Sequence, residues 1–120
     1  MTTLENEPPI ACELYALGPS ERQRQKALLE TIRGKVLRLV EIDEGFELQF
    51  PSDPATFTEI AEWVSLERRC CAFADFAILS RRDDTVWVRL GGGPGAKSVL
   101  FDEMGLAKAA ARTESPRAGK

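Results

Sequence analysis

The chain has 120 residues, 43% of them hydrophobic, which suffices for one domain with a single core and excludes a second. Its 16 basic and 19 acidic residues give a net charge of -3, and the basic residues are dispersed along the chain, so nucleic-acid binding is not expected. No segment resembles a signal peptide or reaches the ~20 apolar residues of a spanning helix, so we expect a cytoplasmic protein that does not bind membranes.

The first elements predicted are a strand and a helix. Ile10, Cys12 and Leu14 alternate with their neighbours at a period of two, as in a strand with one buried face. Pro19 suits the first position of a helix, which should run to about Arg33.

A hairpin and a second helix follow. Residues 36–42 are rich in branched side chains and residues 46–50 alternate, which together predict two paired strands. Asp53 is the expected N-cap and Pro54 the first residue of a helix that should end near Cys71.

The last predicted elements are a second hairpin and a short helix. Residues 76–80 and 85–90 should pair as strands, and a glycine-rich loop at 91–95 should lead into a helix through Met104. This loop looks like a phosphate-binding loop, but Ala96 stands where that motif requires glycine before the lysine. We therefore expect no nucleotide cofactor.

The element order predicts an α+β fold, a two-layer sandwich with a ferredoxin-like βαββαβ core. A fifth strand would extend the sheet at the edge beside the fourth, and a short C-terminal helix would follow. We expect a single domain over residues 8–106, with a disordered N-terminus at 1–7 and a disordered tail at 107–120.

Sulfur is the most informative chemistry in this sequence. There is no histidine, so the commonest general base and metal ligand is missing, and the cysteines are Cys12, Cys70 and Cys71. An odd number of cysteines, two of them adjacent, is a poor disulfide framework and is more typical of reduced thiols. Any site is therefore expected to be a thiol site.

The second helix is expected to bring Cys71 toward Cys12. A helical period places one apolar stripe along it, made of Phe57, Ile60, Ala61, Val64 and Cys71. Cys70 is rotated away from this stripe, and Glu67 precedes Cys71 by one turn. In a ferredoxin-like topology the end of this helix lies above the end of the first strand, so Cys71 should approach Cys12.

Two kinds of thiol chemistry fit this convergence. Adjacent Cα atoms stand ~3.8 Å apart, too close for an ordinary disulfide between Cys70 and Cys71, so Cys12 with either of them is the feasible redox pair. Alternatively, Cys12, Cys70 and Cys71 bind a soft metal or metalloid ion, whereas structural zinc is weakly supported because the familiar paired-cysteine spacing is missing. Glu67, Arg68 and Arg22 are expected to surround these ligands and support them.

Other interpretations remain open. Buried cysteines often serve only as small apolar side chains. The protein can also be a non-catalytic interaction module that forms a homodimer through an open sheet face or an edge strand. A further alternative is an enzyme that acts on a small acidic substrate through Arg22, Arg24 and Arg68, but no constellation of residues specifies a reaction.

Four motifs resemble those of a family of small bacterial proteins without an established activity. The matching segments are Ala11-Cys12-Glu13-Leu14, Glu21-Arg22, Glu67-Arg68-Arg69-Cys70-Cys71-Ala72-Phe73 and Gly93-Pro94-Gly95-Ala96-Lys97. The resemblance spans about residues 8 to 104, and Ala72 stands where the family usually has proline. It implies a shared thiol-bearing site, with a hint of metal or redox chemistry.

Overall fold

A computed structural model describes residues 10–13 and 15–114 and shows four helices and four strands in this part of the chain. In chain order they are α1 (Pro19–Arg33), β1 (Arg38–Ile42), β2 (Gly45–Phe50), α2 (Pro54–Cys70), β3 (Ala74–Ser80), β4 (Val86–Gly92), α3 (Ala96–Glu103) and α4 (Leu106–Glu114). None of these helices combines the length and apolar composition needed to cross a membrane.

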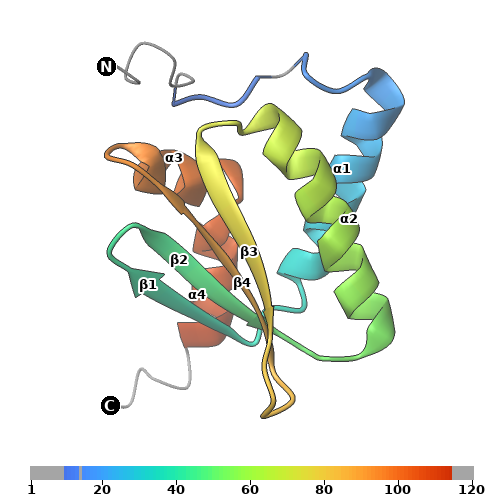
Figure 1. The fold of residues 1–120 in the computed structure, drawn as a ribbon, viewed down its shortest axis with the longest axis vertical. Helices are drawn as coiled ribbons and strands as arrows, with labels where there is room; N and C mark the ends of the chain where they lie inside the picture. The colour runs from blue at the N-terminus through green and yellow to red at the C-terminus, as the bar shows by residue number, and fades with distance from the viewer. Residues whose placement is uncertain (1–9, 14, 115–120) are drawn as a thin grey trace.

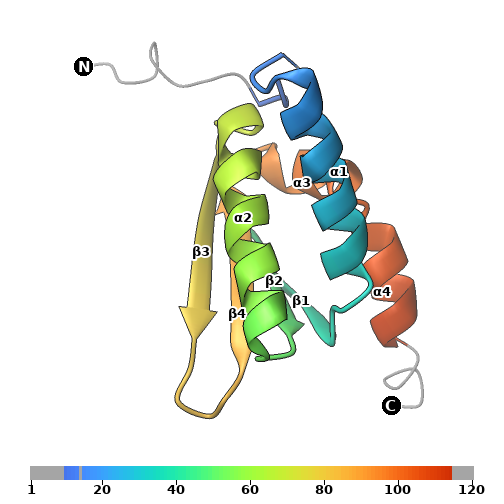
Figure 2. The same ribbon diagram turned by 90° about the vertical axis from the view of Figure 1, so that its right-hand side faces the viewer.

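The strands form one antiparallel sheet in the order β1-β2-β4-β3. The helices make a second layer against one face of this sheet, with α1 and α2 packed side by side (Figures 1 and 2). The chain is therefore α+β, as its pattern of elements predicts.

The ferredoxin-like strand order is wrong for the described residues. Residues 10–13 form no strand, and Ile10 is exposed, while Leu14 lies outside the described residues. The fifth predicted strand, which we expect at the edge of the sheet, corresponds to β4. In the structure β4 lies between β2 and β3, the position that a ferredoxin-like sheet gives to its first strand. Since β4 fills this inner position, the N-terminal segment has no place beside β2.

Local signals explain where the two long helices begin. The Glu21 side chain accepts a hydrogen bond from the Gly18 N–H at 3.1 Å, and Pro19 is the first residue of α1. Asp53 accepts a hydrogen bond from the Thr56 N–H at 3.0 Å, which confirms it as the N-cap of α2.

The buried face of α2 differs from the predicted stripe. The buried residues are Thr56, Ile60, Trp63, Leu66, Glu67 and Cys70. Phe57 is 40% exposed and Ala61 is exposed, so the helix is rotated relative to our expectation. The rotation places Trp63 edge-on to Phe76 of β3, with ring centroids 6.0 Å apart, and brings Cys70 into the core.

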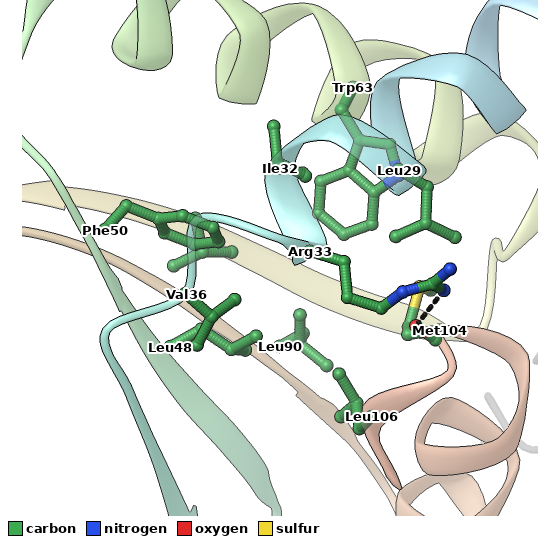
Figure 3. A pocket seen from close by; sticks show the side chains of 11 residues that line it. Leu29, Ile32, Arg33, Val36, Leu48, Phe50, Trp63, Leu90, Met104 and Leu106 are labelled. Atoms are coloured by element: carbon green, nitrogen blue, oxygen red, sulfur yellow. Dashed lines mark hydrogen bonds between the residues drawn. The ribbon is translucent and has the colours of Figure 1, made fainter. Parts of the chain in front are cut away.

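A small apolar cavity of about 20 Å³ lies where α1 and α2 face the sheet and the end of α3 (Figure 3). Leu29, Trp63 and Leu90 are among its lining residues. Arg33 donates a hydrogen bond to the Met104 carbonyl oxygen at 3.2 Å beside it. The lining offers almost no polar partner, so this cavity is a packing gap and carries no chemistry.

The C-terminal segment contains more structure than expected. Disorder was predicted from residue 107, but the backbone is helical from Leu106 to Glu114 as α4. Leu106 and Ala109 are buried in the core. Tertiary packing therefore stabilises a helix that is too short to be stable in isolation. Residues 115–120, the last part of the tail expected at 107–120, and the N-terminus at 1–7 lie outside the described residues.

Candidate thiol site

The segment before α1 lies against the C-terminal end of α2. The Glu13 N–H donates a hydrogen bond to the Cys70 carbonyl oxygen at 2.7 Å. Arg69 forms an ion pair with Glu21 at 2.9 Å and also donates to the Ala16 carbonyl oxygen at 3.4 Å. These hydrogen bonds and this ion pair therefore hold the segment that contains Cys12 near the end of α2.

Cys12 and Cys71 form a disulfide, with Cα atoms 4.5 Å apart and a sequence separation of 59 residues. The expectation of three reduced thiols is therefore wrong for this structure, whereas the approach of Cys71 to Cys12 is confirmed. Cys71 follows the last residue of α2 with φ -111° and ψ 64°, so the backbone leaves the helix at this residue. This turn directs its side chain, 0% exposed, toward the N-terminal segment.

Cys70 is the free cysteine, and it is buried beside the disulfide. Its Sγ lies 3.9 Å from the Cys71 Sγ and accepts a hydrogen bond from the Gln25 side chain at 3.1 Å. Burial raises the pKa of the Cys70 thiol, with a smaller contribution from the neighbouring carboxylate of Glu67. Cys70 is thus held as a neutral thiol within contact distance of a disulfide.

The carboxylate of Glu67 lies beside the three cysteine side chains, and Glu67 is only 4% exposed. One oxygen accepts a hydrogen bond from Gln25 at 2.8 Å, and the other lies 3.3 Å from the Cys71 Sγ. Burial raises the pKa of this carboxyl group, while the hydrogen bond from Gln25 opposes the shift. Sequence reasoning placed Glu67 in a supporting role, but the structure puts it among the sulfur atoms.

These four side chains bring their donor atoms together. The sulfur atoms of Cys12, Cys70 and Cys71 and a carboxylate oxygen of Glu67 all lie within 4.8 Å of one another. We call these four residues the thiol cluster. In its reduced form the thiol cluster can hold one metal ion, whereas the disulfide removes two of its three thiolate ligands.

The predicted arginines lie in different places. Arg22 lies beside the thiol cluster, where it lines a neighbouring pocket. Arg68 is exposed and is not among the residues lining that pocket. Arg24 forms a two-pronged ion pair with Glu62 of α2, at 2.8 and 2.9 Å, on the exposed side of the two helices. The structure therefore brings only Arg22 of the three toward the sulfur atoms.

A pocket of about 160 Å³ opens next to the thiol cluster. Cys12, Cys70 and Glu67 form its inner wall. Cys71 is absent from the lining because it is fully buried behind Cys12. The spacing of Arg22 and Lys26, one turn apart on α1, is the one sequence signal for a shared wall.

Comparisons with protein-family models, with curated proteins and with solved structures each found no match. The chemistry of the thiol cluster therefore has to be inferred from its own geometry.

Proposed function

We propose that the reduced protein binds a single soft metal or metalloid ion through Cys12, Cys70 and Cys71. The observation that carries this proposal is the grouping of three sulfur atoms and one carboxylate oxygen within 4.8 Å of one another. Glu67 is available as a fourth donor. Arg22 contributes positive charge at the edge of the site. The supporting role of Arg68 stays a prediction from the sequence.

The donor set favours a thiophilic ion. Thiolates prefer soft ions such as cuprous copper, and Cys12, Cys70 and Cys71 outnumber the one carboxylate. A hard cation such as magnesium or calcium requires mainly oxygen ligands. Structural zinc usually takes four cysteine or histidine ligands, and the described cluster offers three.

A titration of the phosphine-reduced protein tests this function. We expect one equivalent of cuprous, mercuric or arsenite ion to protect all three thiols from alkylation. The oxidised protein is the matched control, because its disulfide leaves only Cys70 free. A Cys70→Ser variant should retain two protectable thiols and bind more weakly. If the three thiols of the reduced protein stay equally reactive at one equivalent, metal binding is refuted.

Thiol redox chemistry is the second candidate function, favoured by the Cys12–Cys71 disulfide and by the free Cys70 thiol 3.9 Å from the Cys71 sulfur. Mass spectrometry after mild oxidation of the reduced protein should find Cys12 crosslinked to Cys71. A crosslink between two molecules, or three unmodified thiols, would refute an intramolecular redox pair.

Location and assembly belong to the same proposal. A reducing compartment such as the cytoplasm would keep the thiol cluster in its metal-binding form. Membership of the bacterial family with the Glu-Arg-x-Cys-Cys-x-Phe motif, and a homodimer, stay predictions from the sequence.

A further inference from the structure

The pocket beside the thiol cluster is lined by charges of both signs, carried by different elements. Arg22 and Lys26 project from α1, one turn apart, while Glu13 lies next to Cys12 and Glu103 ends α3. All four are exposed, and within the described part of the chain none forms an ion pair. Two cationic and two anionic groups are therefore available to a ligand.

The inner wall of the pocket determines which sulfur atom a ligand can reach. Cys12 lines the pocket, but its disulfide partner Cys71 does not and is 0% exposed. Disulfides are reduced by attack of a thiolate on one sulfur, through a mixed disulfide. An external thiol in this pocket therefore meets the sulfur of Cys12 and leaves Cys71 as the departing thiolate.

We propose that this pocket binds a small zwitterionic thiol, of amino-acid size, that reduces the Cys12–Cys71 disulfide. The ligand's carboxylate would lie toward Arg22 and Lys26, and its ammonium group toward Glu13 and Glu103. The pocket measures about 160 Å³, below the ~300 Å³ at the lower end for drug-sized ligands, so the ligand is small.

The reaction is a balanced thiol–disulfide exchange. The first thiolate forms a bond to the Cys12 sulfur, the Cys12–Cys71 bond breaks, and the departing Cys71 thiolate takes up the proton that the first small thiol lost on ionisation. A second thiolate attacks the ligand sulfur of the mixed disulfide, the bond to Cys12 breaks, and the departing Cys12 thiolate takes up the proton of the second small thiol. Two small thiols are oxidised to one small disulfide while the protein disulfide is reduced to two thiols. This reduction frees Cys12 and Cys71 to bind a metal ion, a consequence that rests on the proposed function.

The test compares four thiols of similar size as reductants of the oxidised protein. Cysteine carries both charges, thioglycolate only the carboxylate, cysteamine only the ammonium group, and mercaptoethanol neither. Rates are compared at equal thiolate concentration and corrected for thiol basicity, because both set intrinsic reactivity. We expect cysteine to be fastest, with at least about a tenfold advantage over mercaptoethanol that shrinks as salt is added.

Substitutions then assign the charges. Arg22→Ala with Lys26→Ala should slow cysteine and thioglycolate about tenfold more than it slows cysteamine and mercaptoethanol, because only the first two carry a carboxylate beside the thiolate. The charge-matched control is Arg82→Ala with Lys108→Ala, two exposed residues outside the pocket lining, and it should change none of the rates. The conservative pair Arg22→Lys with Lys26→Arg should retain the preference and shows whether loss of charge is the cause.

The results separate the two proposals. Equal slowing of all four thiols, or equal slowing by the control pair, would overturn the binding site. An acid-quenched mixed disulfide should map to Cys12, and mapping to Cys71 would overturn the direction of attack. Metal titration after phosphine reduction needs no small thiol, so failure of metal binding would refute the proposed function and leave the thiol preference standing.

Discussion

Glu67 combines a buried position with an acidic side chain, and its energetic effect depends on pH. Burial raises the pKa of Glu67 above the ordinary value of 4.5, and repulsion from Glu103 adds a smaller increase. Hydrogen bonds from Gln25 and Cys70 to the Glu67 carboxylate lower this pKa and so oppose the shift. The folded state therefore retains this proton at pH values where the unfolded chain has lost it. The contribution of the protonated Glu67 carboxyl group to the free energy of unfolding is complete below about pH 4.5. It decreases as pH rises through the folded-state pKa.

We predict that Glu67→Gln makes the oxidised protein less sensitive to rising pH. The amide still accepts the Gln25 hydrogen bond but cannot ionise, so the variant should gain stability relative to the wild type as pH rises above 4.5. Glu67→Ala should instead lose about 1–3 kcal/mol even at low pH, because Gln25 loses one of its two hydrogen-bond acceptors. Urea unfolding from pH 4 to 7 measures both, and parallel pH profiles for wild type and Glu67→Gln would contradict the prediction.

The residues of the thiol cluster were only partly predictable from the sequence. The composition predicted a site based on cysteine, and helical spacing predicted that Glu67 lies one turn before Cys71. The phase of α2 was wrong because Trp63, Leu66 and Cys70 form an alternative apolar stripe, and periodicity alone does not choose between two stripes. A buried glutamate among apolar residues could not be predicted, because its partner Gln25 lies 42 positions away.

At the scale of elements, two glycines set the contact between the hairpins. Gly45 of β2 lies opposite Gly91 of β4 in the sheet. A Cβ at Gly45 would lie 2.6 Å from the Gly91 Cα and would collide with the Leu90 carbonyl oxygen. The two backbones thus approach more closely than any side chain permits, and β4 occupies the inner position next to β2.

We predict that Gly45→Ala destabilises the protein by about 1–3 kcal/mol, because the β2–β4 pair must separate to admit a methyl group. Gly34→Ala is the matched control: Gly34 has φ -70°, and a Cβ added at this residue would meet nothing closer than 3.5 Å. The control should be neutral or stabilising by up to ~1 kcal/mol. Chemical unfolding of both variants measures the difference, and equal stability would show that the close approach is unimportant.

Most individual elements were predictable because their signals are local. Prolines and caps mark the beginnings of α1 and α2, and alternating side chains mark the strands. The alternation of Ile10 and Cys12 misled the prediction because a strand also needs a partner, and no described strand pairs with this segment. The helix α4 was missed because its small residues resemble a polar tail until Ala109 packs in the core.

At the scale of the whole molecule, the disulfide joins the N-terminal segment to the second layer across a sequence separation of 59 residues. A crosslink that closes a loop of this length restricts the unfolded chain, and the chain-entropy model assigns it about 4 kcal/mol.

We predict that a reductant lowers the melting temperature of the wild-type protein in the absence of metal. Cys70→Ser retains the disulfide and should respond to reductant as the wild type does. Cys12→Ser removes the disulfide, so its melting temperature should be low in both conditions. Calorimetry with and without a phosphine provides the measurement, and an unchanged wild-type melting temperature would mean that the crosslink contributes little to stability.

The sequence by itself determined the α+β class, the extents of α1 and α2, the two hairpins and a site based on sulfur. These features depend on residues close in the chain, where caps, periodicity and composition act. Only the tertiary structure decided that β4 pairs with β2, that Cys12 bonds to Cys71 while Cys70 stays free, and that Glu67 lies among them. The β-strand pairing and the Cys12–Cys71 bond join residues distant in sequence, and Glu67 and Cys70 are buried through packing between α1 and α2. These arrangements therefore follow from how the layers pack.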